Sequence, residues 1–198
     1  MAVSIFVMPL RTWLEGSFQA TWGPGAPGPT RPRRSEDEAE REVEKLRNQL
    51  GSQLGRRPDW DESGPLRSAT TLSADGFARP FLKARQESFR HPFPRLSVLE
   101  PPQIWLPLPF EGVLLLEAPW EGAGELAMVS SSGLQEELVR LLEVLAQDPA
   151  MEELEGLSTG ASLTGLAADF YELLAVTRRL RELAAMSLEH RAPVIVES

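Results

Sequence analysis

Residues 112–129 read GVLLLEAPWEGAGELAMV, which places two apolar runs on either side of a glycine-rich stretch. The runs at 112–117 and 126–129 have the length and composition of strands. Glu121-Gly-Ala-Gly124 lies between them and supplies the glycines that a tight connection favours. The sequence therefore predicts a β-hairpin in the middle of the chain.

Strand patterns also occur near both ends of the chain. Residues 3–8, Val-Ser-Ile-Phe-Val-Met, are rich in β-branched and apolar side chains and are followed by Pro9. Residues 193–196, Pro-Val-Ile-Val, have the same character. Residues 104–110 include two prolines, each of which biases the residue before it towards extended backbone. We therefore expect a strand at each terminus and an extended segment before the hairpin.

Five segments have the period of amphipathic helices. Ser35-x-x-Glu38 is a capping box that begins a helix through about residue 54. Ser132-x-x-Gln135 is a second capping box, and its helix ends near Asp148. We expect three more helices: 77–89 with Pro80 in its first turn, 151–157, and one from a cap at Ser162 or Thr164 to about residue 189.

Three other stretches lack a helical period. Residues 12–22 predict a turn followed by a short strand, since Gly16 interrupts their aromatic and apolar side chains. Residues 55–73 are polar and predict irregular backbone. Residues 23–35 are rich in proline and glycine, which predicts a mobile loop. This loop lacks the pattern of a phosphate-binding loop.

These elements predict an α+β (mixed α/β) fold rather than a doubly wound one. We expect one small mixed or antiparallel sheet that contains both terminal strands and the central hairpin, packed by about four helices. A chain of 198 residues has the size of one domain, so we expect a single globular domain over 1–198. Such a chain buries about 70% of its unfolded surface and needs no disulfide or metal for stability.

The composition excludes several chemistries. The chain has no cysteine, which rules out disulfides, thiolate metal sites and cysteine nucleophiles. Residues 1–10 lack the basic start of a secretory signal. No apolar run approaches the roughly 20 residues of a membrane span. We therefore expect a cytoplasmic protein with no cofactor and no membrane partner.

Charge is divided unevenly between the two halves of the chain. Residues 1–98 hold 15 Lys and Arg against 12 Asp and Glu, a net charge of +3, whereas residues 99–198 hold 5 against 17, a net charge of −12. An acidic half argues against nucleic acid, since binding of phosphates needs cations. It suits a basic protein partner instead. Four acidic residues are the predicted contacts: Glu136, Glu137, Glu152 and Glu153.

Gly156-Leu-Ser158-Thr-Gly160 fits the G-x-S-x-G pattern of α/β-hydrolases, and Asp169 and His190 follow in the required order. Ser158 would be the nucleophile and His190 the base. However, helix-prone residues precede the motif where a strand is needed. Asp169 and His190 are also about 31 Å apart if one straight helix carries both. We therefore favour an interhelical turn, and Ser158 and His190 remain weak catalytic candidates.

Asp59-Trp-Asp-Glu-Ser-Gly64 matches the first half of a calcium-binding loop. The seventh position is a proline, and Thr70 stands where the loop needs a bidentate glutamate. His91 and His190 have no ligand partners at metal-binding spacing. The sequence therefore predicts a polar turn at 59–64 and no metal site.

The five tryptophans fall into two groups. Trp13 and Trp105 have the surroundings of core residues. Trp22, Trp60 and Trp120 lie beside glycine, proline or acidic residues, where an exposed ring would anchor a partner. We therefore list these three rings with the four glutamates as candidate binding residues.

The function that these patterns favour is a non-catalytic protein-interaction module, because no cluster of catalytic groups survives its sequence context. A bacterial immunity or inhibitor-type protein and an accessory subunit of a larger assembly are the examples we consider. Residues 168–196 are similar to small acidic α/β proteins of high-GC bacteria. Two alternatives are a small serine hydrolase using Ser158 and a small-molecule-binding domain with a pocket near Trp105 and Trp120.

Overall fold

The computed structural model describes residues 2–16, 34–62, 64–98, 103–119, 124–155 and 165–197. These residues form six strands and six helices. The strands are β1 (Ala2–Val7), β2 (Ser68–Ser73), β3 (Gln103–Leu106), β4 (Val113–Glu117), β5 (Glu125–Ser130) and β6 (Val194–Glu197). The helices are α1 (Leu10–Glu15), α2 (Glu36–Leu54), α3 (Ala74–Glu87), α4 (Ser131–Ala146), α5 (Pro149–Glu155) and α6 (Gly165–His190).

All six strands belong to one mixed sheet with the order β2-β1-β6-β3-β5-β4. Only β3 and β5 run parallel, and the other neighbours are antiparallel. The two terminal strands lie side by side, with Ile5 opposite Val196. The predicted hairpin is β4 and β5, which lies at one edge of the sheet. The predicted α+β fold, with both terminal strands in one small sheet, is therefore confirmed.

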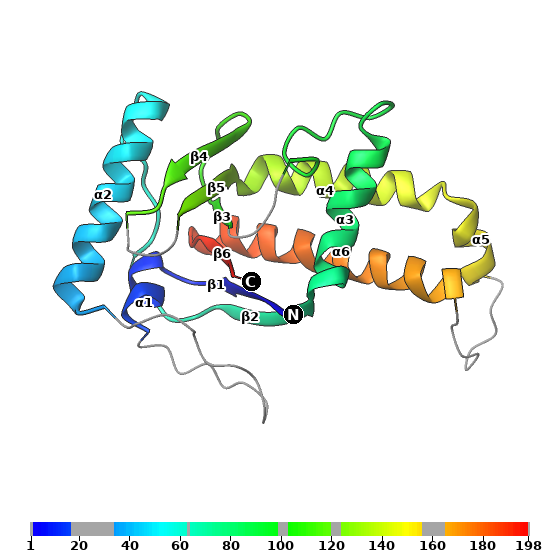
Figure 1. The fold of residues 1–198 in the computed structure, drawn as a ribbon, viewed down its shortest axis with the longest axis horizontal. Helices are drawn as coiled ribbons and strands as arrows, with labels where there is room; N and C mark the ends of the chain where they lie inside the picture. The colour runs from blue at the N-terminus through cyan, green and yellow to red at the C-terminus, as the bar shows by residue number, and fades with distance from the viewer. Residues whose placement is uncertain are drawn as a thin grey trace.

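Helices cover both faces of this sheet (Figure 1). Alternate side chains of a strand point to opposite faces. Trp105 and Val194 therefore join the core formed with α3, α4 and α6, whereas Ile104 and Ile195 join the core formed with α1 and α2. Because both faces of the inner strands are covered, their sequences are continuous apolar runs rather than alternating ones. Trp13 and Trp105 both lie in the core, as predicted.

The cap of α2 is confirmed, whereas the cap of α4 differs from the prediction. Ser35 accepts a hydrogen bond from the amide of Glu38, and the Glu38 side chain accepts one from the amide of Ser35. In α4 the N-cap is Ser130, whose hydroxyl oxygen accepts a hydrogen bond from the amide of Gly133. The helix thus begins two residues before the predicted start. The candidate caps of α6, Ser162 and Thr164, lie outside the described residues.

Two elements were not predicted, and one proline lies elsewhere than expected. Strand β2 falls within 55–73, where irregular backbone was expected, and it pairs with β1 along its whole length. Helix α1 replaces the beginning of the turn expected at 12–22, and it ends at Gly16, which has a φ of 60°. Pro80 lies in the middle of α3 rather than in its first turn.

The expected mobile loop at 23–35 lies outside the described residues except for Arg34 and Ser35. The amide of Arg34 donates to the carbonyl of Leu14, which places the start of α2 beside α1. Among the described helices, none is both long and apolar enough to cross a membrane.

Candidate functional site

The weak catalytic candidates Ser158 and His190 are not brought together with Asp169 in the described part of the chain. Ser158 lies outside the described residues. Asp169 lies near the start of α6 and His190 is its last residue, so the helix separates them by about 31 Å. Asp169 is instead paired with Arg79 of α3 at 2.9 Å.

Of the three tryptophan candidates, the structure describes Trp60, and this ring is buried rather than exposed. Trp60 is only 2% exposed, and the Arg47 guanidinium lies 4.7 Å from the centre of its ring. Its indole N–H donates to the carboxylate of Glu62. The ring is therefore a core group and is not on the surface, because it packs beneath α2. Trp22 and Trp120 lie outside the described residues.

The four candidate glutamates also separate into distinct environments. Glu136 and Glu152 are exposed, as a binding surface requires. Glu137 is fully buried, so it is not available to a partner. Nothing is described for the side chain of Glu153. Only Glu136 and Glu152 can therefore be placed on the surface.

Glu137 holds the segment that follows α3 against α4. Its carboxylate accepts hydrogen bonds from the backbone amides of Arg95 and Leu96, and from the Arg95 guanidinium at 3.0 Å. Arg95 also donates to the carbonyl of Phe110. A methyl group at Gly133 would lie 2.2 Å from the guanidinium carbon, so any side chain there would displace the Arg95 guanidinium.

The burial of Glu137 could have been predicted from the spacing of apolar residues around it. Glu137 follows Leu134 by three residues and precedes Leu141 by four, which places it within the apolar stripe of the helix. Its partner Arg95 is 42 residues away, and no local pattern indicates that pairing.

A hollow of about 350 Å³ lies at the C-terminal end of α6 and includes His190. It is lined by Asp59, Trp60, Asp61, Glu62, Glu189, His190 and Arg191. Arg191 has a φ of 50°, the left-handed conformation that ends helices and that non-glycine residues adopt at a cost. Its side chain pairs with Asp59 at 2.7 Å, and its carbonyl accepts from the amide of Asp61.

Glu62 is a titratable group of this hollow whose pKa is shifted by its surroundings. Burial raises the pKa of its carboxyl, while the amide of Arg11 and the charge of Arg47 act in the opposite direction. The bond to Trp60 also favours the ionised form. These contacts join the 59–62 segment to α1 and α2. Within the described ranges, no three Asp, Glu or His side chains are grouped so that they could hold a metal ion.

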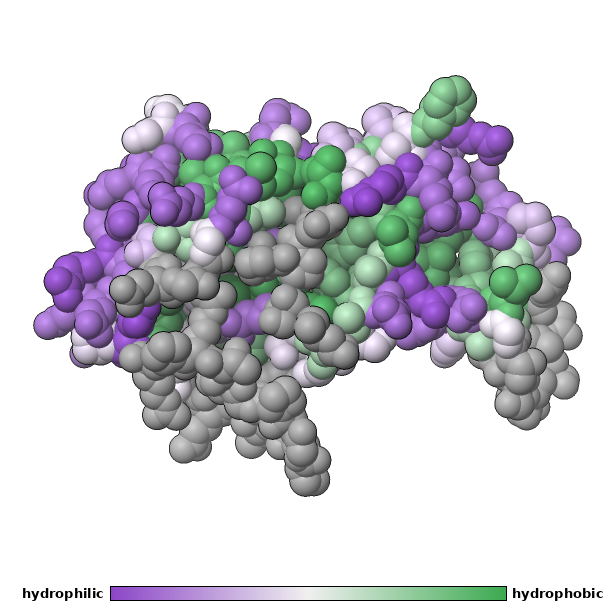
Figure 2. Space-filling view, in the orientation of Figure 1, coloured by the Kyte–Doolittle hydropathy of each residue, from purple (hydrophilic) through white to green (hydrophobic). Residues whose placement is uncertain are grey.

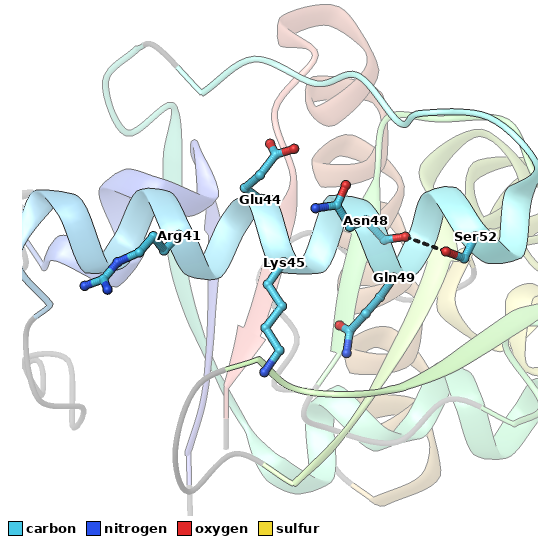
Figure 3. A pocket seen from close by; sticks show the side chains of 6 residues that line it. All are labelled: Arg41, Glu44, Lys45, Asn48, Gln49 and Ser52. Carbon is cyan, nitrogen blue, oxygen red and sulfur yellow. Dashed lines mark hydrogen bonds between the residues drawn. The ribbon is translucent and has the colours of Figure 1, made fainter.

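A second hollow, of about 490 Å³, follows the outer face of α2 (Figure 3). It is lined by Arg41, Glu44, Lys45, Asn48, Gln49 and Ser52. All six residues come from one helix, and the hydroxyl of Ser52 donates to a backbone carbonyl of the same helix. Since no second element among the described residues supplies groups that converge on it, this surface has the character of a solvated helix face rather than of a reaction site.

Comparisons with protein-family models, with curated proteins and with solved structures found no significant match for this chain.

Proposed function

We propose that this protein is a non-catalytic interaction module that binds a basic protein partner through its acidic C-terminal half. The observation that supports this proposal is a set of exposed glutamates in the C-terminal half that have no ion pair with any residue that the structure describes. Residues 99–177 contain 14 Asp and Glu but only one basic residue, Arg140.

Acidic groups in the N-terminal half are arranged differently, because many of them face an arginine. Seven glutamates there have ion pairs, namely Glu15, Glu36, Glu40, Glu42, Glu44, Glu62 and Glu87. In the C-terminal half, six glutamates are exposed and have no ion pair among the described residues: Glu117, Glu125, Glu136, Glu143, Glu152 and Glu189. The N-terminal charges are thus largely neutralised within the molecule, whereas these six are not.

Charges of one sign on a surface repel one another and reduce stability unless a partner neutralises them. A basic partner would remove that repulsion and would also associate faster, because opposite potentials steer the encounter. Immunity or inhibitor-type proteins of bacteria and accessory subunits of larger assemblies are the two kinds of protein that we consider for this role.

The experiment compares two variants with the same change in charge. The tagged chain is purified from its native host at low and at high salt, and the proteins that accompany it are identified. We expect a stoichiometric basic partner that is retained at low salt and lost at high salt, because salt screens exposed charges. Combining Glu136→Gln, Glu143→Gln and Glu152→Gln is expected to abolish its capture.

The matched control combines Asp37→Asn, Glu40→Gln and Asp75→Asn, which neutralises three exposed acids of the N-terminal half. We expect this control to retain the partner. Equal loss of the partner in both variants would show that only net charge matters. Recovery of the chain alone at both salt concentrations would contradict the proposal.

A further inference from the structure

Strand β4 is the last strand of the sheet on the hairpin side, since the order ends β3-β5-β4. Its register with β5 runs from Val113 opposite Val129 to Glu117 opposite Glu125. An edge strand has one row of backbone N–H and C=O groups that its own sheet does not use. Every second residue of β4 therefore contributes its backbone N–H and C=O groups to this free row.

One hydrogen bond determines the row. The amide of Ala118 donates to the carbonyl of Gly124 at 2.8 Å, so these two residues form a hydrogen-bonded pair of the ladder. Hydrogen-bonded and non-hydrogen-bonded pairs alternate along an antiparallel ladder. Leu114 and Leu116 therefore bond to β5, whereas the N–H and C=O groups of 113, 115 and 117 point away from it.

The side chains along this edge are unusually apolar for a surface strand. Leu115 is 56% exposed, and Val113 and Leu114 are half-buried. Figure 2 shows a hydrophobic area where Figure 1 places β4. Exposed edges of this kind are templates for the pairing of a further strand.

Acidic residues surround this apolar edge. Residues 109–130 contain four glutamates and no lysine, arginine or histidine. Glu117 ends β4, and Glu125 is its partner across the hairpin. Glu111 is fully exposed two residues before the strand, although Arg95 lies 3.5 Å from its carboxylate. Pairing β4 with β4 of a second copy would bring two such acidic hairpins together, so the charge favours a basic occupant.

We propose that β4 receives an extended segment of the partner as a seventh strand, and that this segment has apolar side chains flanked by Lys or Arg. Backbone hydrogen bonds to 113, 115 and 117 would give affinity, and the surrounding glutamates would give selectivity. This inference rests on the proposed function, which it refines by naming the binding mode and the chemistry of the partner segment.

The first test uses three synthetic peptides with the purified protein. The probe is Lys-Val-Thr-Val-Thr-Val-Lys, and its controls are the same peptide with Glu at both ends and the Lys peptide with N-methyl groups along one edge. We expect the Lys probe to bind at least about tenfold more tightly than either control, measured by calorimetry at low salt. Absence of binding by the Lys probe, or equal binding by a control, would overturn the inference.

The second test asks whether backbone groups of β4 make the contact. Leu115→Pro removes the outward N–H, whereas Leu115→Ala keeps it and removes most of the side chain. We expect Leu115→Pro to weaken binding of the Lys probe at least about tenfold and Leu115→Ala to weaken it much less. Hydrogen exchange should show slower exchange of the amides of 113, 115 and 117 when the probe binds. Strand addition would be overturned if both variants weakened binding of the Lys probe equally. It would also be overturned if the probe slowed amide exchange only at residues other than 113, 115 and 117.

Two outcomes separate this inference from the proposed function. If the host partner is lost on neutralising Glu136, Glu143 and Glu152 but retained by Leu115→Pro, the acidic surface binds the partner and β4 does not. If the unmodified chain is a dimer in solution and Leu115→Pro is a monomer, the occupant of the edge is a second copy, which overturns a basic segment.

Discussion

Glu136 and Glu137 are neighbours on α4, yet their carboxylates have opposite surroundings. Successive residues of a helix point about 100° apart, so one of the pair lies in the apolar stripe and the other faces outward. Glu137 is buried against Arg95 and two backbone amides, whereas Glu136 is exposed. Residue type alone therefore does not separate a structural carboxylate from a surface one.

We expect Glu137→Ala to destabilise the protein by about 3–5 kcal/mol, because it leaves the Arg95 guanidinium and two amides buried without their partner. Glu136→Ala, the matched control, should change the free energy of unfolding by no more than about 0.5 kcal/mol. Urea unfolding of the two variants measures both values. Similar values for the two would show that the buried pair has no structural role.

The burial of Glu62 makes the free energy of unfolding depend on pH, and it also determines the sign of that dependence. Since burial raises its pKa, the folded state holds the proton more tightly than the unfolded state does. The stability that this group contributes is fully present below its unfolded pKa, near 4.5, and is lost as pH rises through the folded pKa. Glu62→Gln should therefore flatten the decline in unfolding free energy above pH 4.5, measured by urea unfolding over a pH series. A constant difference from the parent protein at every pH would contradict this.

At the scale of the element, the hairpin register predicts that proline is tolerated differently at two neighbouring positions of β4, 114 and 115. Leu114→Pro removes an N–H that bonds to β5, whereas Leu115→Pro removes one that faces the free edge. Proline is tolerated in strands where its missing donor faces solvent. We expect Leu114→Pro to be the less stable variant by about 2 kcal/mol, as measured by thermal or urea unfolding. The reverse order would mean that the row assignment is wrong.

The elements that the sequence predicts well are those with a strong apolar pattern. The hairpin and α2 have continuous or periodic apolar residues, and both were located within one or two residues. Strand β2, Ser-Ala-Thr-Thr-Leu-Ser, is an edge strand without such a pattern, so only its pairing with β1 reveals it. Helix α1 has six residues, too few to display a period.

The burial of two candidate residues, Trp60 and Glu137, was not predicted, and the reason is physical. Neither the burial of Trp60 nor that of Glu137 is local, since each depends on an element distant in sequence. Three consecutive serines at 130–132 each have the chemistry of a cap, and the sequence does not decide which one is used. Net charge, by contrast, is a sum over residues and can be read directly from the sequence.

At the scale of the whole molecule, the two cores share one sheet, because each inner strand sends alternate side chains into both. We therefore predict that they unfold together. Leu46→Ala on the α2 side and Leu138→Ala on the α4 side should each cost about 2–5 kcal/mol. In urea, tryptophan fluorescence and far-UV circular dichroism should give coincident transitions for both variants. Separate transitions would show two independent units.

Strand β6 lies between β1 and β3, although it is made after every other strand. On the ribosome, the nascent chain can therefore form the β1–β2 ladder and the β3–β5–β4 ladder, but no strand joins the two ladders until 194–197 emerge. Until then each ladder has an open edge where β6 will pair, and open edges expose backbone groups that can pair with other chains. Pairing of 194–197 with both ladders, rather than the formation of any single helix, would then be the event that completes the sheet.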